Sequence, residues 1–575
     1  MNETYQLSAA RSANKPTFAA LGLLLICFAV GLAYSLQAED PLEDDSVHHY
    51  LMSKWLLRHG NLVVNFWGRP AVTLAYFPAA QFGFFWCRLT SLAICLLAAW
   101  YTFRLAGNIG FKYAWLAVPL VFFQNQFFRL STDLLTEPLF SLIVICAVGN
   151  YIFRRHSRAA ILFSISAAAR PEGFFFIILF GIVLIVEALL GKLGSGKKGW
   201  VKFIGTSALL LCVPAVWSIA GGLIHGGLDL LWLTKSNSWD TLRYKYGSDG
   251  VLHYLLKMNY AVGIIVLAPA IAGMAACFRR GRIWIVPTLW IFFFVLHTYL
   301  RTSGYYASGG YPRYFAAVAP LMGLMAVAGV DRISRSLRWL LFSILVCAGL
   351  YWGIAPFLNE TLGRIPRSNL GSAIGRNMGS FILFCATAMF LAIWLIFLRR
   401  TFRSLENRHP VRQIALPIIL AGLVAGTGCS CLIFNRPAGR SLTYVSITEF
   451  GEWLRGEYPS LYEDLGSSGP RKTDAKLLFP RWYLHMRQGW DPYDESRFSG
   501  SFELDNIKTL PAGSIVVWDS DFGPGESRMS EERLDEIGRL KPIKNFFTKR
   551  SKGRSDFSLK VYEVTDHEQH ERETP

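Results

Sequence analysis

Long apolar segments recur along the first 434 residues, and they constrain the fold of this chain more than any other feature. A helix needs about 20 mostly apolar residues to cross a bilayer. We identify about thirteen segments of this kind, of which the third and fifth are short. They lie near residues 17–36, 82–105, 114–128, 134–153, 159–169, 173–190, 201–223, 259–277, 283–299, 313–330, 338–357, 379–398 and 414–434. We therefore predict an all-α polytopic membrane protein with about 13 transmembrane helices.

The composition agrees with this prediction and excludes several other classes of protein. Charged residues make up only 17% of the 575 residues, whereas a soluble domain carries about 25%. The ten cysteines form no CxxC pair, so they indicate neither a zinc site nor a redox motif. Residues 435–575 carry 21 basic and 24 acidic residues, and the net charge of +18 therefore resides in the apolar part. We predict no nucleic-acid partner.

The distribution of charge predicts the orientation of the spans. Cytoplasmic loops are enriched in Lys and Arg. With a cytoplasmic N-terminus, the dense basic clusters fall on the inner side, and 12 of the 16 acidic residues before Asn435 fall on the outer side. This orientation fits a bacterial inner membrane. The first apolar segment lacks a clear small-residue cleavage site, so we interpret it as a retained helix.

Thirteen spans place residues 435–575 outside the cytoplasm, as a domain separate from the transmembrane domain 1–434. Helical stretches over 446–456 and 530–540 and strand-like runs over 514–518 and 558–564 predict a small α/β extracytoplasmic domain. We expect its polar tail, from Asp566, to be frayed.

The first outer loop, roughly 37–81, begins with the densest acidic cluster. Five of the seven residues 39–45 are acidic, including Glu43, Asp44 and Asp45. An amphipathic helix is expected next, with Ser46 as its N-cap and with its axis in the membrane interface. Its apolar side would contain Val47, Tyr50, Leu51, Trp55 and Leu56. A solvated loop beside a helix N-terminus is the simpler reading of these acids.

Two further outer segments carry paired charges. Asp133 and Glu137 are four residues apart, so a helical turn would place both carboxylates on one face. Carboxylates at the mouth of a span are costly and indicate function, although a charge pair facing headgroups would also explain them. Arg170 and Glu172 lie in an Arg-Pro-Glu-Gly sequence that predicts a turn at a membrane face. The alternatives are a structural corner with a local ion pair, or one kinked helix.

A fourth outer stretch, 301–313, is basic and aromatic without acids. Arg313, with Tyr311 and Tyr314 beside it, supplies donors suited to a phosphate. An interfacial aromatic belt with a snorkelling Arg is the alternative. The acidic residues, the interfacial helix and these donors are all predicted at the outer membrane face. Together they suit the transfer of a sugar from a lipid phosphate to a hydroxyl. A carboxylate would take the acceptor proton, and the donors would stabilise the leaving phosphate.

These motifs resemble those of the C-type superfamily of integral-membrane glycosyltransferases, which includes protein O-mannosyltransferases and the lipid A aminoarabinose transferase. The resemblance rests on the acids of the first outer loop, Asp133, the Arg-Pro-Glu-Gly turn and the Arg313-Tyr314-Phe315 sequence with Pro320. It implies a polyprenyl-phosphate sugar donor and a hydroxyl acceptor on a lipid, glycan or protein. It leaves open a divalent cation, which the clustered carboxylates would suit.

The resemblance implies an inverting reaction with Asp44, Asp45 and Asp133 as catalytic residues. Asp44 or Asp45 would be the base, and Asp133 would support it or orient the acceptor. The substrate-binding residues would be Glu43, Glu137, Arg170, Glu172, Tyr311, Arg313 and Tyr314. A flippase for a lipid-linked sugar is one alternative, which the near absence of charge at mid-membrane depth disfavours. A non-catalytic subunit of a glycan assembly complex is another.

Overall fold

A computed structural model of the chain describes residues 14–227, 232–235, 247–304, 309–333, 409–479, 481–499, 503–525, 529–549 and 556–566. The chain divides into two compact units. The first contains Met1–Ser35, Arg88–Thr132 and Thr136–Arg436, and the second contains Leu36–Cys87, Asp133–Leu135 and Pro437–Pro575. The second unit thus takes in the segment predicted to be the first outer loop as well as the C-terminal region. The predicted domain boundary at residues 434/435 stays a prediction.

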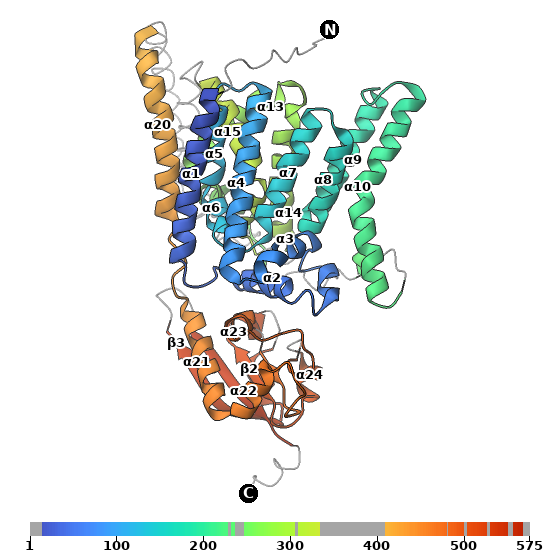
Figure 1. The fold of residues 1–575 in the computed structure, drawn as a ribbon, viewed down its shortest axis with the longest axis vertical. Coiled ribbons are helices and arrows are strands. Elements are labelled where there is room, and N and C mark those ends of the chain that lie inside the picture. Colours follow the sequence, from blue (N-terminus) through green and yellow to red (C-terminus); the bar gives the residue numbers. More distant parts are fainter. Residues whose placement is uncertain are drawn as a thin grey trace, which may run out of the picture. The chain divides into compact units, whose positions relative to one another are not determined.

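The described part of the first unit is built from helices, most of which run side by side (Figure 1). They are α1 (Asn14–Gln37), α4 (Phe84–Ile109), η2 (Ala114–Leu116), α5 (Ala117–Phe122), α6 (Asn125–Ser131), α7 (Thr136–Ile152), α8 (His156–Ala169), α9 (Glu172–Leu189), α10 (Gly196–Ile224), α11 (Trp232–Lys235), α12 (His253–Ala261), α13 (Ile264–Phe278), η4 (Gly281–Trp284), α14 (Ile285–Ser303), η6 (Pro312–Val318), α15 (Ala319–Ile333) and α20 (His409–Phe434).

Six helical segments of the described residues are long and apolar enough to cross a membrane, or up to eight if each of two bent helix pairs is one span. The chain is thus a multi-pass membrane protein. The predicted spans 338–357 and 379–398 lie outside the described residues. The count of thirteen and the cytoplasmic N-terminus therefore remain predictions.

The predicted span 114–128 is not one helix, because η2, α5 and α6 divide it. Polar side chains explain the break. Gln124 donates hydrogen bonds from Nε2 to the carbonyls of Leu120 (2.9 Å) and Ala319 (2.8 Å). Asn125 donates from Nδ2 to the carbonyl of Asn259 (2.9 Å). Buried amides must be satisfied away from water, and here they bind one local carbonyl, that of Leu120, and the carbonyls of two distant helices, α15 and α12.

The Arg-Pro-Glu-Gly sequence forms a turn between two helices. Helix α8 ends at Ala169 and α9 begins at Glu172, and the two helices pack against each other. A Cβ atom at Gly173 would collide with the backbone of Ser166 and Ala167, so only glycine permits this close return of the chain.

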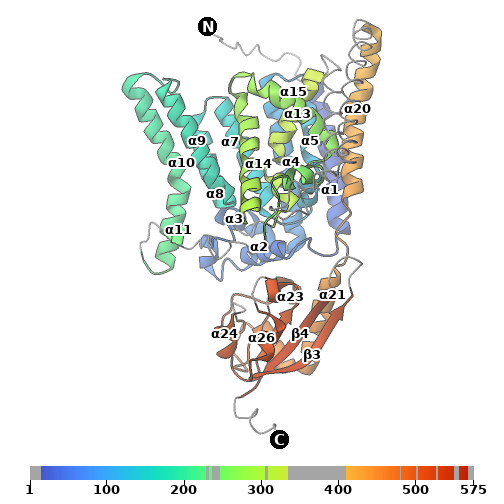
Figure 2. The same cartoon turned by 180° about the vertical axis from the view of Figure 1, so that it is seen from behind.

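Small residues also bring α13 and α15 together, on the side of the unit that Figure 2 shows. A side chain at Gly273 would collide with the backbone of Met325, and one at Gly329 would collide with the carbonyl of Pro269. Close backbone contact of this kind is how helices associate in lipid, where dispersion rather than the hydrophobic effect drives packing.

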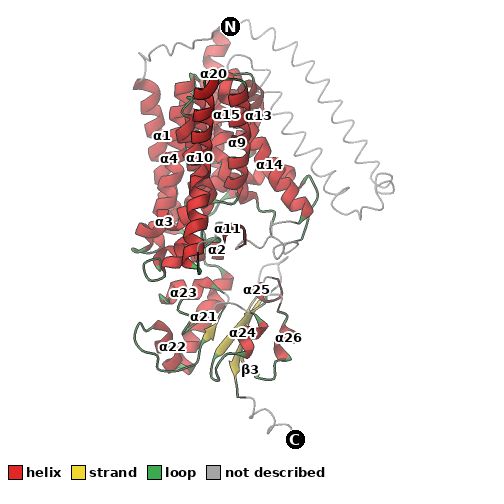
Figure 3. Cartoon of the chain, turned by 90° about the vertical axis from the view of Figure 1, so that its right-hand side faces the viewer, coloured by secondary structure: helices red, strands yellow, loops and turns green. Residues whose placement is uncertain are grey.

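The second unit combines three helical segments from the first outer loop with a small mixed domain. The loop forms α2 (Asp44–Lys54), η1 (Gly60–Val64) and α3 (Pro70–Ala80). The C-terminal region forms α21 (Leu442–Glu457), α22 (Pro459–Gly466), β1 (Leu477–Leu478), α23 (Trp482–Gln488), α24 (Leu504–Lys508), β2 (Ile515–Asp519), α25 (Phe522–Gly525), α26 (Glu531–Asp535), β3 (Leu540–Thr548) and β4 (Phe557–Val564). All described strands belong to this region (Figure 3).

The four strands form one sheet in the order β1-β2-β4-β3, in which β1 and β2 are parallel and the other pairs antiparallel. The predicted α/β character, the helix near 446–456 and the strands near 514–518 and 558–564 are confirmed. The helix predicted over 530–540 shortens to α26, and β3 was not predicted. Strand β3 lies at the sheet edge and carries lysines, so its apolar alternation is weak. The tail after Asp566 lies outside the described residues.

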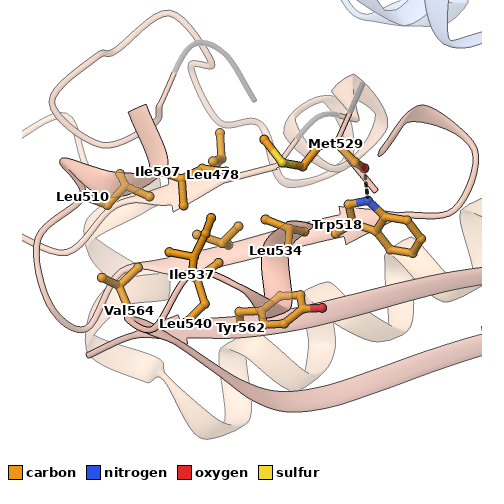
Figure 4. Close-up of a cluster of buried hydrophobic side chains, with 11 residues drawn as sticks. Leu478, Ile507, Leu510, Trp518, Met529, Leu534, Ile537, Leu540, Tyr562 and Val564 are labelled. Atoms are coloured by element: carbon orange, nitrogen blue, oxygen red, sulfur yellow. Dashed lines mark hydrogen bonds between the residues drawn. The ribbon is translucent and has the colours of Figure 1, made fainter. Parts of the chain in front are cut away.

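The sheet is stabilised by a cluster of buried apolar side chains. Figure 4 shows this cluster, which includes Leu478, Leu534, Ile537 and Tyr562. Trp518 also belongs to it, and its indole N–H donates a hydrogen bond of 2.8 Å to the carbonyl of Met529. The indole is therefore buried without leaving its N–H donor unsatisfied.

Candidate functional site

The acidic residues of the first outer loop gather around the N-terminus of α2. Asp133 is fully buried, and its Oδ2 accepts hydrogen bonds from the hydroxyl of Ser46 (2.7 Å) and the backbone N–H of Leu42 (3.0 Å). Asp44 and Asp45 occupy the first turn of α2. Negative charge there is favoured by the helix dipole. Asp133, 87 positions from Ser46, is thus fixed beside the first turn that carries Asp44 and Asp45.

The predicted N-cap at Ser46 is wrong. Helix α2 begins at Asp44, and Glu43 takes the N-cap position with an extended backbone (φ −149°, ψ 152°). Because Ser46 lies inside the first turn, its hydroxyl is directed to Asp133 instead of an N-terminal amide. Of the predicted apolar side, Val47, Tyr50 and Leu51 are buried within α2, which ends at Lys54. Its position in a membrane interface stays a prediction.

Asp133 and Glu137 do not share a helical turn. Helix α6 ends at Ser131 and α7 begins at Thr136, with a bend of 114° between them. Asp133 therefore lies in a non-helical break, and its carboxylate does not have the i,i+4 relation to Glu137 that the sequence predicts. Gln124 and Asn125, which interrupt the helix upstream, and Pro138, which lies early in α7, are compatible with this break.

Two side chains of the C-terminal region lie in the electrostatic field of these acids. Burial, together with the charges of Asp44 and Asp133, raises the pKa of the Tyr444 hydroxyl. Burial would lower the pKa of Arg481, but the charges of Asp519 and Asp44 outweigh it and raise that pKa. Arg481 also donates to both Asp519 oxygens at 3.2 Å. Asp44 therefore lies in the electrostatic field of a buried cation and a buried phenol within the second unit.

The first unit contains a separate buried ion cluster centred on Arg170. Its Nη1 lies 2.7 Å from Glu137 Oε1 and donates to the Thr136 hydroxyl at 2.8 Å. Its Nε and Nη2 donate to the two oxygens of Glu172 at 3.1 and 2.7 Å. His297 of α14 completes the cluster, with Nε2 at 3.2 Å from Glu172 Oε1. Paired, planar hydrogen bonds of this kind are strong and fix orientation.

The aromatic and basic stretch lies beside this cluster in the same unit. Tyr314 stacks on His297 with ring centroids 5.1 Å apart, and the Arg170 guanidinium lies 5.6 Å from the Tyr314 ring centroid. Arg313 is buried, and its guanidinium lies 5.0 Å from the ring of Tyr311, which is 42% exposed. This placement suits a cation held in apolar surroundings near an exposed aromatic edge.

The structure therefore groups the predicted site residues into two sets. Glu43, Asp44, Asp45 and Asp133 belong to the second unit. The other set belongs to the first unit and contains Glu137, Arg170, Glu172, Tyr311, Arg313 and Tyr314.

Four neighbours of these sets were not predicted, namely Thr136, His297, Tyr444 and Arg481. His297 was detectable in principle, because an ionisable residue within an apolar span indicates a buried polar contact. Nothing local in the sequence distinguished Tyr444 or Arg481 from the other Tyr and Arg residues of the C-terminal region.

The clustered carboxylates suit a divalent cation by their chemistry. Among the described residues, however, no three His, Cys, Asp or Glu side chains lie where one ion could bind them together.

Comparison with known proteins gives structural matches only. No protein-family model and no curated protein sequence matches the chain. The fold is similar to that of ArnT, an aminoarabinose transferase, from Cupriavidus metallidurans. The crystal structure bound to undecaprenyl phosphate aligns with a TM-score of 0.54 and 12% identity, over 95% of this chain and 97% of that chain. The apo structure gives a TM-score of 0.55 and 14% identity, over 95% and 98%.

The similarity extends through nearly the whole chain, so it includes the C-terminal region as well as the helices. The fold that the resemblance predicts is therefore shared with ArnT, whereas membership of the C-type superfamily stays a prediction. A fold does not by itself specify a reaction, which has to be argued from the side chains.

Proposed function

We propose that the chain is a glycosyltransferase of the bacterial inner membrane that moves a sugar from a polyprenyl-phosphate donor to a hydroxyl acceptor at the extracytoplasmic face. The observation that carries this proposal is the acidic cluster at the start of α2, in which the buried Asp133 is hydrogen-bonded beside the turn that bears the half-buried Asp44 and Asp45. The ArnT fold supports it, since that protein is bound to undecaprenyl phosphate in one crystal structure.

The proposed chemistry is a single inverting displacement. The acceptor hydroxyl oxygen attacks the anomeric carbon, the bond from that carbon to the phosphate oxygen breaks, and polyprenyl phosphate leaves. The acceptor proton passes to Asp44 or Asp45. The nearby charge of Arg481 would keep Asp44 ionised and so able to accept a proton, and we therefore place Asp44 first as the base. Asp133, held by Ser46, would orient the acceptor or support the base, and Glu43 would contact the substrate.

The leaving phosphate needs donors that strengthen their hydrogen bonds as charge develops. We assign this role first to Arg313, with Tyr311 and Tyr314 as neighbouring donors. Arg170 is the second candidate; its guanidinium donates to Thr136 and Glu172 and lies against Glu137. In that case Glu137 and Glu172 contribute by holding Arg170 in place. The acceptor is a hydroxyl of a lipid, a glycan or a protein.

Two measurements test the proposal. Mass spectrometry of lipid copurifying with the full chain should detect undecaprenyl phosphate or a sugar-linked form of it. Incubation with undecaprenyl-phosphate-linked sugars and hydroxyl acceptors should then release undecaprenyl phosphate, and Asp44→Asn should stop the release. Transbilayer movement of the lipid in proteoliposomes, without its hydrolysis and unaffected by Asp44→Asn, would indicate the flippase. Neither binding nor turnover would indicate the non-catalytic subunit.

A further inference from the structure

The acidic loop and the C-terminal region are joined just before α2. Asp40 is buried, and its Oδ1 accepts a hydrogen bond of 2.9 Å from the hydroxyl of Tyr483. Its Oδ2 accepts one of 2.7 Å from the backbone N–H of Ser441. The backbone N–H of Glu39 donates to the carbonyl of Ala438 at 2.8 Å. Three hydrogen bonds thus fix the chain four residues before Asp44.

A second contact lies in the middle of α2. The imidazole of His48 is stacked between two indoles, with ring centroids 4.1 Å from Trp67 and 3.8 Å from Trp482. The planes of His48 and Trp482 are only 11° apart. Burial and the neighbouring His49 lower the pKa of His48 well below its usual value. The ring therefore stacks as a neutral aromatic group at neutral pH.

A third contact follows the end of α2. His59 Nε2 lies 2.8 Å from Asp491 Oδ2, and Arg58 Nη1 lies 3.2 Å from the same oxygen. Asp491 is itself buried. The ring of Tyr493 packs against the apolar cluster of Met52, Leu56 and Leu62. The C-terminal region therefore contacts the loop before, within and after the helix that carries Asp44.

From these three contacts we propose that the C-terminal region is a clamp on α2, with Tyr483, Trp482 and Asp491 as positioning residues for the acidic first turn. All the residues involved belong to one compact unit. Catalytic groups must be held to about 0.5 Å of their productive geometry by packed neighbours. A short helix of eleven residues is marginal without tertiary packing. The clamp supplies that packing, and its consequence for turnover rests on the proposed function.

The test removes the central contact and measures the order of α2 directly. In the full chain, Trp482→Ala should accelerate amide hydrogen exchange in a peptide covering α2 by about 3- to 10-fold, the loss expected for one aromatic stack. Peptides from β2 and β4 should keep native exchange. Trp482→Phe retains a stacking ring and should restore slow exchange. Trp453→Ala is the matched control, because Trp453 packs on Phe450, Tyr458 and Phe546 within the C-terminal region.

Turnover gives a second readout. With an undecaprenyl-phosphate-linked sugar that the native chain consumes, Trp482→Ala should lower kcat while KM for the donor stays near native. Native exchange in α2 together with native kcat in Trp482→Ala would overturn the clamp. A native chain that consumes no such donor would refute the proposed function, while accelerated exchange in α2 would still support the clamp.

A milder variant covers the case in which Trp482→Ala unfolds the whole C-terminal region. Tyr483→Phe removes only the hydroxyl that donates to Asp40 and keeps the ring that stacks on Tyr444 at 3.8 Å. It should accelerate exchange at the N-terminal end of α2 and leave β2 and β4 unchanged. Tyr458→Phe, which loses a hydroxyl contact to Glu563 instead, is its control. Equal amide exchange rates at the N-terminal end of α2 in Tyr483→Phe and Tyr458→Phe would also overturn the clamp.

Discussion

Ser46 donates a hydrogen bond of 2.7 Å to Asp133 although the two residues lie 87 positions apart in the chain, and both are fully buried. This contact ties the break between α6 and α7 to the first turn of α2. A buried carboxylate is costly unless it is hydrogen-bonded, and Asp133 Oδ2 meets this requirement through Ser46 and the N–H of Leu42. The geometry of the acidic cluster therefore depends on a serine that the sequence suggested as a helix cap.

Replacing the proposed base should abolish transfer. We expect Asp44→Asn to lower turnover by about 10²–10⁴-fold, the usual contribution of a general base, and Asp45→Asn to have a smaller effect. Asp44 is coupled electrostatically to both Tyr444 and Arg481. Release of undecaprenyl phosphate measures the rate. Near-native turnover in both variants would remove this chemistry from the loop.

Ser46→Ala should weaken the acidic cluster without removing a carboxylate. A hydrogen bond to a charged group contributes about 1.5–3 kcal/mol, so this variant should lower the free energy of unfolding by that amount and reduce turnover. Ser53→Ala is the matched control, because Ser53 is also buried in α2 but donates to the carbonyl of His49. Denaturant unfolding of the purified chain measures both. Equal stability losses would show that the carboxylate partner confers no additional stability.

Arg313 should not be replaceable by lysine. A guanidinium makes paired, planar hydrogen bonds to phosphate oxygens, which an ammonium cannot. We expect Arg313→Lys to lower the transfer rate substantially and Arg313→Ala to lower it further. The expected loss of transition-state stabilisation is on the order of a few kcal/mol. Arg104→Lys, on the exposed side of α4, is the control. Native steady-state kinetics of Arg313→Lys at saturating donor would indicate an interfacial anchor instead.

Arg170→Gln should destabilise the first unit. The substitution leaves Glu137 and Glu172 buried without their cation, and breaking a buried ion pair costs about 3–5 kcal/mol. Thermal unfolding in detergent should therefore begin at a lower temperature, whereas exposed Arg104→Gln should change little. Native thermal stability of Arg170→Gln would mean that the cluster is not structural and would strengthen Arg170 as a donor-phosphate ligand.

The C-terminal region should lose stability in mild acid. Burial lowers the pKa of His485 to about 3, whereas an unfolded histidine titrates near 6.5. The unfolded state therefore binds more protons than the folded state between these two pH values. The contribution of neutral His485 to the free energy of unfolding is thus fully present above about pH 6.5 and declines as the pH falls toward 3. His485→Phe should flatten this dependence. Hydrogen exchange in β2 and β4, corrected for intrinsic rates at each pH, measures it. An unchanged slope in the variant would assign the dependence to other groups.

The sequence by itself determined the elements whose cause is local. Apolar runs specify membrane helices because each span must satisfy its backbone internally, and the Arg-Pro-Glu-Gly turn follows from Pro171 and the close approach at Gly173. Acidic residues before an apolar pattern likewise predicted α2. Tertiary structure alone decided which side chains meet. His297 joins Glu172, Ser46 joins Asp133, and Trp482 joins His48 through packing between distant segments. Such contacts depend on the whole fold, because the residues next to a polar side chain in the sequence do not specify which distant group it will meet.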